Sequence, residues 1–244
     1  MKDLIGILMM LWSFTIKAQI IDDFEGGDLS MDSLWITSNE SGRGMDFSIT
    51  HGELNSDGPS GSGTLFIATE LALSSQSTEL SWEFYIRYES PPSGSNYVKV
   101  FLLSDRVDLN DDPKGYYLQM GESGSNDGID LYHTSSNIPL ISDPMNGIAE
   151  GIDVCIQVFR SSTGEWILKT LSSESLDTII LGTALDTRLI SSGYFGFLVR
   201  HSSSRRKAFF FDEVGVKADQ IPDLMAPDVL DIAVISEVEI KIIF

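Results

Sequence analysis

Apolar and polar side chains alternate along most of this chain, a pattern typical of β-strands with one buried face. Residues 80–88 show it most clearly, with every second residue apolar. Similar runs predict further strands at residues 20–24, 46–49, 64–68, 97–104, 116–121, 129–133, 153–160, 165–171, 193–200 and 209–216. Segments rich in Gly, Pro, Asn and Asp separate these runs, and only residues 178–188 are predicted to form a short helix.

Many short strands without alternating helices predict an all-β fold, in which two antiparallel sheets pack face to face as a jelly-roll sandwich. At 244 residues, the chain is long enough for one such domain. Aromatic residues at the inward positions of the strands are expected to fill the space between the sheets: Trp82, Phe84, Phe195, Phe197, Phe209 and Phe211.

The first 19 residues have the pattern of a signal peptide. Lys2 precedes an apolar run at residues 4–16, and cleavage is expected after Ala18 or Gln19. The run is shorter than the about 20 apolar residues that span a bilayer. We therefore expect the mature protein to be secreted or at the cell surface without membrane insertion; an uncleaved anchor in the membrane interface is the alternative.

The pattern changes again near the C-terminus. The sandwich is expected to occupy residues 20–217, and residues 218–228, which contain two prolines, are predicted to form a linker. Apolar alternation returns in residues 229–244 and stops at the last residue. We interpret this segment as the truncated start of a further β domain.

Charge and cysteine content narrow the possible partners. The 16 basic and 36 acidic residues give a net charge of −20, which repels nucleic acid and anionic lipid surfaces. The single cysteine, Cys155, excludes an intramolecular disulfide and is expected to be a small buried hydrophobe. A large apolar core must therefore hold the fold together.

Several short motifs, taken together, resemble one known module. They are Asp22-Asp23-Phe24, Gly26-Gly27-Asp28, Trp35, Gly52-Glu53-Leu54, Asn96 to Val100, Gly115 to Glu122, Asp127 to Tyr132 and Phe211-Asp212-Glu213-Val214. This pattern is similar to the concanavalin-like N-terminal module of secreted bacterial multidomain proteins, which continue into Ig-like and lamin-tail domains. The resemblance implies a fold rather than a catalytic site. It also implies that residues 229–244 begin an Ig-like domain.

Catalytic motifs are weak. Hydrolases of this fold carry paired carboxylates on one strand face, yet no Glu-x-Asp-x-x-Glu run occurs here. The segment around Ser123 lacks the closing glycine of a nucleophile elbow. We therefore predict a non-catalytic module for adhesion, glycan contact or spacing, with a carbohydrate-active hydrolase as the alternative. A deep cleft with two carboxylates facing each other would favour the hydrolase.

Exposed aromatic rings stack on sugars, so an extracellular glycan or cell-surface component is the expected partner. The candidate ligand-binding residues, if they are exposed, are Trp35, Tyr85, Tyr117, Tyr132 and Trp166. Packing in the core or at a sheet edge is the alternative for each of them.

Calcium is the candidate cofactor, because acidic side chains recur at two places. Asp108, Asn110 and Asp112 alternate as in the first half of an EF-hand loop, although Pro113 replaces the glycine of that motif. If the first and last predicted strands of the sandwich are neighbours, Asp22 or Asp23 also comes near Asp212. A solvated turn and water-facing acids are the respective alternatives.

Overall fold

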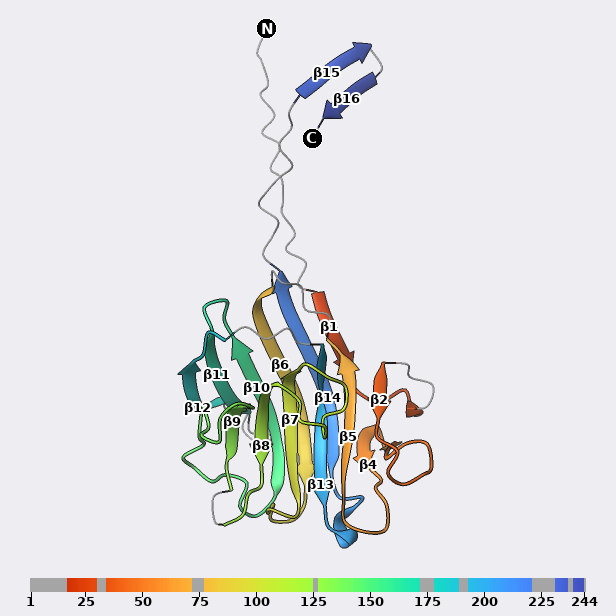
Figure 1. Ribbon diagram of the computed structural model, residues 1–244, viewed down its shortest axis with the longest axis vertical. Helices are drawn as coiled ribbons and strands as arrows, with labels where there is room; N and C mark the ends of the chain where they lie inside the picture. Colours follow the sequence, from red (N-terminus) through yellow and green to blue (C-terminus); the bar gives the residue numbers. More distant parts are fainter. Residues whose placement is uncertain are drawn as a thin grey trace.

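The computed structural model describes residues 17–29, 34–71, 77–124, 127–171, 178–188, 193–220, 231–236 and 239–243. Two antiparallel sheets lie face to face (Figure 1), which confirms the predicted all-β sandwich. Among these residues no helix is long and apolar enough to cross a membrane.

The larger sheet has eight strands. In spatial order they are β12 (Thr178–Leu185), β11 (Glu165–Leu171), β10 (Ile152–Arg160), β6 (Ser77–Tyr88), β14 (Phe210–Gln220), β4 (Glu53–Ser56) and β3 (Phe47–Thr50), with β1 (Lys17–Asp22) also paired to β14. The smaller sheet contains β2 (Trp35–Thr37), β5 (Gly63–Glu70), β13 (Tyr194–His201), β7 (Tyr97–Ser104), β8 (Gly115–Met120) and β9 (Ile129–His133). A separate pair is formed by β15 (Asp231–Ser236) and β16 (Glu239–Ile243).

The core lies between the two sheets and is largely aromatic. All six aromatic residues expected to point inward are buried: Trp82, Phe84, Phe195, Phe197, Phe209 and Phe211. The other apolar residues of the alternating run on β6 are also buried: Leu80, Ile86 and Tyr88. Phe197 contacts rings from both sheets: its centroid lies 4.3 Å from that of Phe211, 5.9 Å from that of Phe84 and 6.4 Å from that of Trp35. Such offset and edge contacts add to the free energy of area burial.

Strand β14 is the centre of the larger sheet because three strands pair with it. β6 lies along one edge, while β4 and β1 share the other, with Phe211 opposite Leu54 and Val216 opposite Ile20. The first and last strands of the sandwich are therefore neighbours, which is the condition on which the second calcium hypothesis depends. A β-bulge interrupts the pairing with β6 next to Glu213, whose backbone is left-handed (φ 50°).

The predicted helix at residues 178–188 is wrong, because the chain forms strand β12 there. Three β-branched residues open this segment, and Gly182 in its middle weakens a helix. Pairing along β11 provides the backbone partners for the strand. The short strands β2 and β4 were not predicted, since three or four residues give too little alternation to recognise.

Both ends of the expected sandwich extend further than the sequence indicated. β14 continues to Gln220, and residues 221–230, most of the predicted linker, lie outside the described residues. β1 includes the last residues of the expected signal peptide, with Ala18 opposite Lys217. The signal peptide and the Ig-like start at residues 229–244 stay predictions.

His201, at the end of β13, is fully buried. Its Nδ1 lies 3.1 Å from the carbonyl oxygen of Ser202 and is therefore assigned as the protonated nitrogen. Its Nε2 has no hydrogen-bond partner among the described residues and faces Gly58 and Gly63 so closely that a Cβ on either glycine would crowd it. Burial lowers the pKa of this imidazole, so the folded protein holds it neutral.

We predict that Phe197→Ala lowers the free energy of unfolding by about 3–5 kcal/mol, because it leaves a cavity between the sheets. Urea denaturation measures this change. Ile180→Ala is the control, since Ile180 is 61% exposed, and it should change stability by no more than about 0.5 kcal/mol. A loss below about 1 kcal/mol for Phe197→Ala would contradict the central role of this ring.

A second prediction concerns acid stability. The pKa of His201 is lower in the folded than in the unfolded chain, where it is about 6.5, so the unfolded chain binds more protons as the pH falls below that value. The free energy of unfolding should therefore decrease between about pH 7 and pH 5, and less steeply in His201→Gln. The slope should be reduced rather than abolished, because burial also lowers the pKa of His133.

Candidate functional site

Two of the candidate sugar-binding aromatics are core residues. Trp35 is 4% exposed and Trp166 is fully buried. The Trp35 indole donates to Asp22 Oδ2 at 2.6 Å, and Trp166 stacks on Trp82 with centroids 5.8 Å apart. Neither ring has a free face for a sugar, so the expected exposure is wrong for both. The reason is that each occupies an inward position on its strand.

The three candidate tyrosines lie on the outer faces of opposite sheets. Tyr85 on β6 donates its hydroxyl to Asp153 of β10 at 2.7 Å. Tyr117 and Tyr132 stack across β8 and β9 with centroids 5.3 Å apart, and the Tyr132 hydroxyl donates to Glu122 at 2.8 Å. Tyr132 is mostly buried, whereas Tyr85 and Tyr117 are partly exposed. The candidates therefore do not form one site.

The acids at the terminal strands come near one another but do not form a calcium site. Burial raises the pKa of Asp212, and the neighbouring charges of Glu213, Glu53 and Asp23 raise it further. Asp22 already accepts hydrogen bonds on both oxygens, from Trp35 and from the Phe24 amide. Calcium needs six to eight oxygen ligands. Among the described residues no three acidic, histidine or cysteine side chains gather to hold a metal.

In the acidic loop between β7 and β8, the side chains of Asp108 and Asp112 already have partners within the loop. Asp108 accepts the Asn110 amide at 2.9 Å, and Asp112 pairs with Lys114 at 2.6 Å. The two aspartates thus stabilise a turn and an ion pair. Within the described part of the chain, these residues do not fit the calcium site that their spacing suggested.

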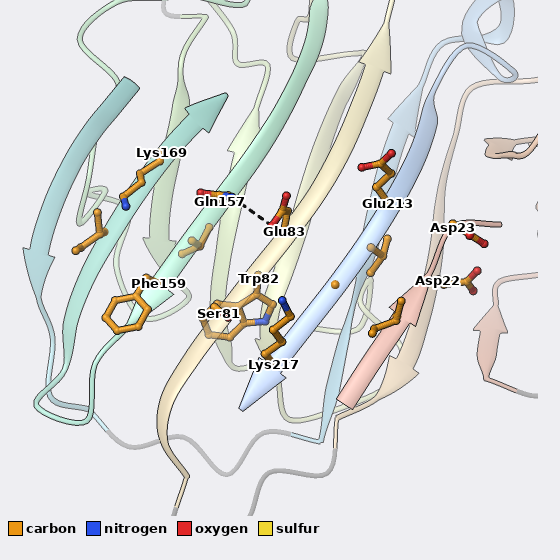
Figure 2. Close-up of a pocket in the computed structure, with 15 residues that line it drawn as sticks. Asp22, Asp23, Ser81, Trp82, Glu83, Gln157, Phe159, Lys169, Glu213 and Lys217 are labelled. Atoms are coloured by element: carbon orange, nitrogen blue, oxygen red, sulfur yellow. Dashed lines mark hydrogen bonds between the residues drawn. The ribbon is translucent and has the colours of Figure 1, made fainter. Parts of the chain in front are cut away.

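A groove of about 700 Å³ lies on the outer face of the larger sheet (Figure 2). Its lining comes from β11, β10, β6, β14 and β1. Since neighbouring strands lie about 4.8 Å apart, five strands span about 19 Å. The groove is therefore suited to an elongated ligand.

Side chains of mixed polarity line this groove. Phe159 of β10 is a partly exposed ring beside the aliphatic surface of Ile167 on β11. Gln157 donates to Glu83 Oε2 at 3.2 Å across β10 and β6. Figure 2 shows Lys169 on β11, at the opposite end of the groove from Asp22 and Asp23. A ring, an amide and charged groups at fixed spacing can hold a hydroxylated ligand by packing and hydrogen bonds.

Acidic side chains of the groove raise the pKa of the Cys155 thiol. Cys155 lies on β10, two residues before Gln157. Its thiol is half-buried rather than buried as expected, because odd positions of β10 face outward. Burial and the charges of Glu83 and Glu213 raise its pKa to about 11. The thiol is therefore protonated at neutral pH and is not an activated nucleophile.

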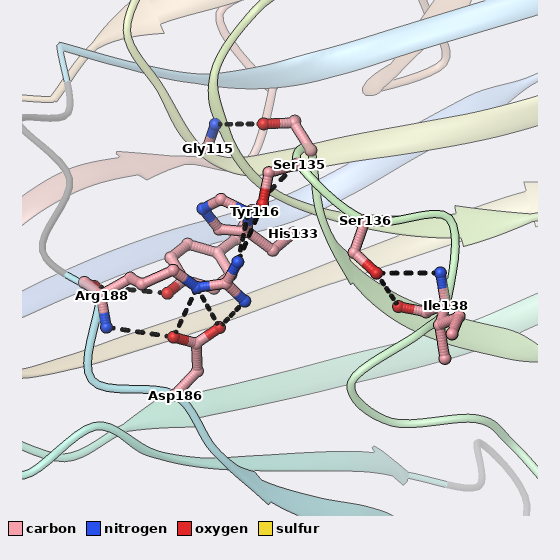
Figure 3. A network of polar contacts seen from close by, with 9 residues as sticks. Gly115, Tyr116, His133, Ser135, Ser136, Ile138, Asp186 and Arg188 are labelled. Atoms are coloured by element: carbon pink, nitrogen blue, oxygen red, sulfur yellow. Dashed lines mark hydrogen bonds and ion pairs between the residues drawn. The ribbon is translucent and has the colours of Figure 1, made fainter.

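A second polar cluster links the segment after β12 to β9 (Figure 3). Arg188 binds both carboxylate oxygens of Asp186, and its Nη1 donates to His133 Nδ1 at 3.0 Å and to Ser135 Oγ at 2.9 Å. Burial alone would raise the pKa of Asp186, but the hydrogen bonds from Arg188 lower it. Because Asp186 orients Arg188 rather than His133, the cluster lacks the base-orienting contact of a catalytic triad. Its contacts hold two chain segments together.

Of the residues that the sequence predicts as site residues, only Asp22 and Asp23 line the groove, and they were predicted as metal ligands. The available signal was the outward set of the predicted strands, in which Ser81 and Glu83 alternate with core residues, as do Gln157 and Phe159. Recognising a groove from them requires knowing that β10, β6 and β14 are neighbours. These strands are far apart in sequence and joined by crossovers.

No protein-family model matches the sequence. A comparison with curated proteins also finds no match.

Solved structures do match the fold. The CBM2 module of the evolved Dit protein of Lactobacillus casei BL23 phage J-1 aligns with a TM-score of 0.58 at 12% identity, over 84% of this chain and 96% of that one. The carbohydrate recognition domain of Emp47p aligns with a TM-score of 0.57 at 13% identity, over 82% and 93%. The exoplasmic/lumenal domain of VIP36 in a Ca²⁺/Man-bound form gives 0.55 at 12% identity, over 93% and 97%.

At these identities the matches establish the architecture alone. The chain has the concanavalin-like β-sandwich fold that is shared by these carbohydrate-recognition and carbohydrate-binding domains.

Proposed function

We propose that this chain is a non-catalytic glycan-binding module, secreted or displayed at the cell surface, and that the groove on the larger sheet holds the glycan. The observation that carries the proposal is the groove itself, which crosses five strands and combines an aromatic ring with polar side chains. The names of the structurally similar domains, a carbohydrate recognition domain and a CBM2 module, support the same ligand class.

The charge of the groove favours a neutral glycan. Four carboxylates line it, from Asp22, Asp23, Glu83 and Glu213, against the two ammonium groups of Lys169 and Lys217. An anionic polymer would meet this local excess of negative charge at close range. Neutral hydroxyls can instead donate to the carboxylates and accept from the lysines.

The groove variants give a direct test. Phe159→Ala should weaken binding of a neutral oligosaccharide, identified on a glycan array, about tenfold, or about 1.4 kcal/mol, because it removes the ring that packs on the sugar. Gln157→Ala should weaken it by a smaller factor. Isothermal titration calorimetry measures both variants.

Ile138→Ala is the matched control, since Ile138 is 76% exposed and lies outside the groove lining. Titrations run with Ca²⁺ and with EDTA show whether calcium contributes, because the similar VIP36 domain has a Ca²⁺/Man-bound form. Binding to no glycan under either condition, or native affinity in Phe159→Ala, would refute the groove as the binding site.

Hydrolysis is the rival function, and one observation favours it. Glu83 on β6 and Glu213 on the neighbouring strand β14 both line the groove, so it holds the two carboxylates that a glycosidase needs. Incubation of the bound oligosaccharide with the protein should release no reducing ends. Release that disappears in Glu83→Gln or Glu213→Gln would replace the binding proposal with a glycosidase.

A further inference from the structure

A second hollow, of about 250 Å³, lies on the outer face of the smaller sheet, on the opposite side of the sandwich from the groove. Strands β7 and β8 form its floor through Tyr97, Lys99 and Tyr117, and the loop between them forms a wall with Asn110 and Asp112. The volume is just below the roughly 300–1,000 Å³ of pockets for drug-sized ligands. It therefore suits a small ligand, such as one sugar ring.

The wall of this hollow is held in place before any ligand arrives. Leu109 is 1% exposed and packs with Phe101 and Leu198 in a small apolar cluster on the outer face of the sheet. Asp108 closes the turn by accepting the Asn110 amide. The side-chain amide of Asn110, by contrast, is exposed and has no hydrogen-bond partner within the described segments. A preformed wall lowers the entropy cost of binding.

Lys99 is the one cationic side chain in the lining of this hollow. Its Nζ lies 4.5 Å from the centroid of the Tyr117 ring, a cation–π distance. No carboxylate of the described residues lies within 4.0 Å of it. Burial lowers the pKa of Lys99, and Glu122 opposes this effect from a greater distance. A partly desolvated ammonium group without an ion pair is costly, and a bound anion would relieve that cost.

Two carboxylates around the hollow are already engaged: Glu122, whose charge acts on Lys99, and Asp112, which lines the hollow. Glu122 accepts the Tyr132 hydroxyl at 2.8 Å and the Gln119 amide at 3.4 Å. Asp112 pairs with Lys114 at 2.6 Å. Lys99 is thus left as the positive group that faces a ligand in the hollow.

We propose that this hollow binds one carboxylated sugar ring, a uronic acid, whose carboxylate pairs with Lys99. The side-chain amide of Asn110 bonds the ring hydroxyls, and Tyr97 and Tyr117 pack against the ring. This site is separate from the groove: the groove takes neutral glycan, and the hollow takes an acidic residue. At physiological salt the net negative charge of the chain is screened beyond about 8 Å, so it does not prevent a contact at close range.

The test is calorimetric titration of the full chain with trigalacturonate and triglucuronate, and with their carboxyl-reduced, neutral counterparts. We expect at least one acidic trisaccharide to bind at least tenfold more tightly than its neutral counterpart. Lys99→Met keeps the aliphatic stem and removes the charge, so it should lower affinity for the acidic ligand at least tenfold. Lys207→Met, which removes an exposed lysine outside the lining of the hollow, should keep the native affinity.

Two further variants make the outcome decisive. Asn110→Ala changes an exposed side chain and should weaken binding several-fold, which tests the site even if Lys99→Met fails to fold. Phe159→Ala should leave binding of the acidic ligand unchanged, so failure of the groove and failure of the hollow are distinguishable. No preference for either acidic ligand, or native affinity in Lys99→Met or Asn110→Ala, would overturn the proposal.

Discussion

The structure depends on the aromatic packing between its two sheets. With a single cysteine, the chain has no intramolecular disulfide, so burial of apolar area must hold the layers together. Phe197 of β13 meets Phe84 of β6 and Phe211 of β14, and so connects the middle strands of both sheets. Trp82, Trp166 and Tyr116 make a second group of ring contacts further along the sandwich. These contacts also fix which face of each strand is turned outward.

That constraint determines where ligands can bind. Because every second side chain of a strand points into the core, the side chains between them point outward and form the outer face of the sheet. On the larger sheet, these faces combine Phe159, Gln157 and Glu83 into a groove. On the smaller sheet, they bring Tyr117 and Lys99 beneath the loop that holds Asn110. The two hollows lie on opposite sides of the molecule and differ in charge, which is why we assign them different sugars.

The polar clusters of the molecule mostly stabilise it. Arg188 binds Asp186 and contacts His133, and the buried Asp46 accepts hydrogen bonds from Ser38 and two backbone amides. Buried or half-buried charges of this kind need partners. Lys99 differs, since its ammonium group is partly desolvated and no described carboxylate forms an ion pair with it. This difference separates a candidate binding group from a structural one.

The sequence by itself determined the fold class, most strand positions and the inward aromatic set, because alternation with a period of two is a local property of each strand. From the sequence, the pairing of β1 with β14 was only a condition of the calcium hypothesis, and the structure shows that the two strands are neighbours. It failed at β12, where residues such as Ile179 and Ile180 are compatible with either structure and the decision comes from pairing with β11.

Which side chains are exposed, and which of them lie together in a groove or hollow, depends on the tertiary structure. Alternation places Trp166 and Ile167 on opposite faces of β11, and Tyr116 and Tyr117 on opposite faces of β8. It does not say which face is buried, because a ring is equally apolar whether it points to the core or to solvent. Exposure therefore depends on which face the neighbouring sheet covers. The groove combines residues from strands that are distant in sequence, and the order of those strands follows from crossovers that no local pattern encodes. The hollow lies mainly on the consecutive strands β7 and β8 and the loop between them, and Leu198 of the distant strand β13 completes its lining.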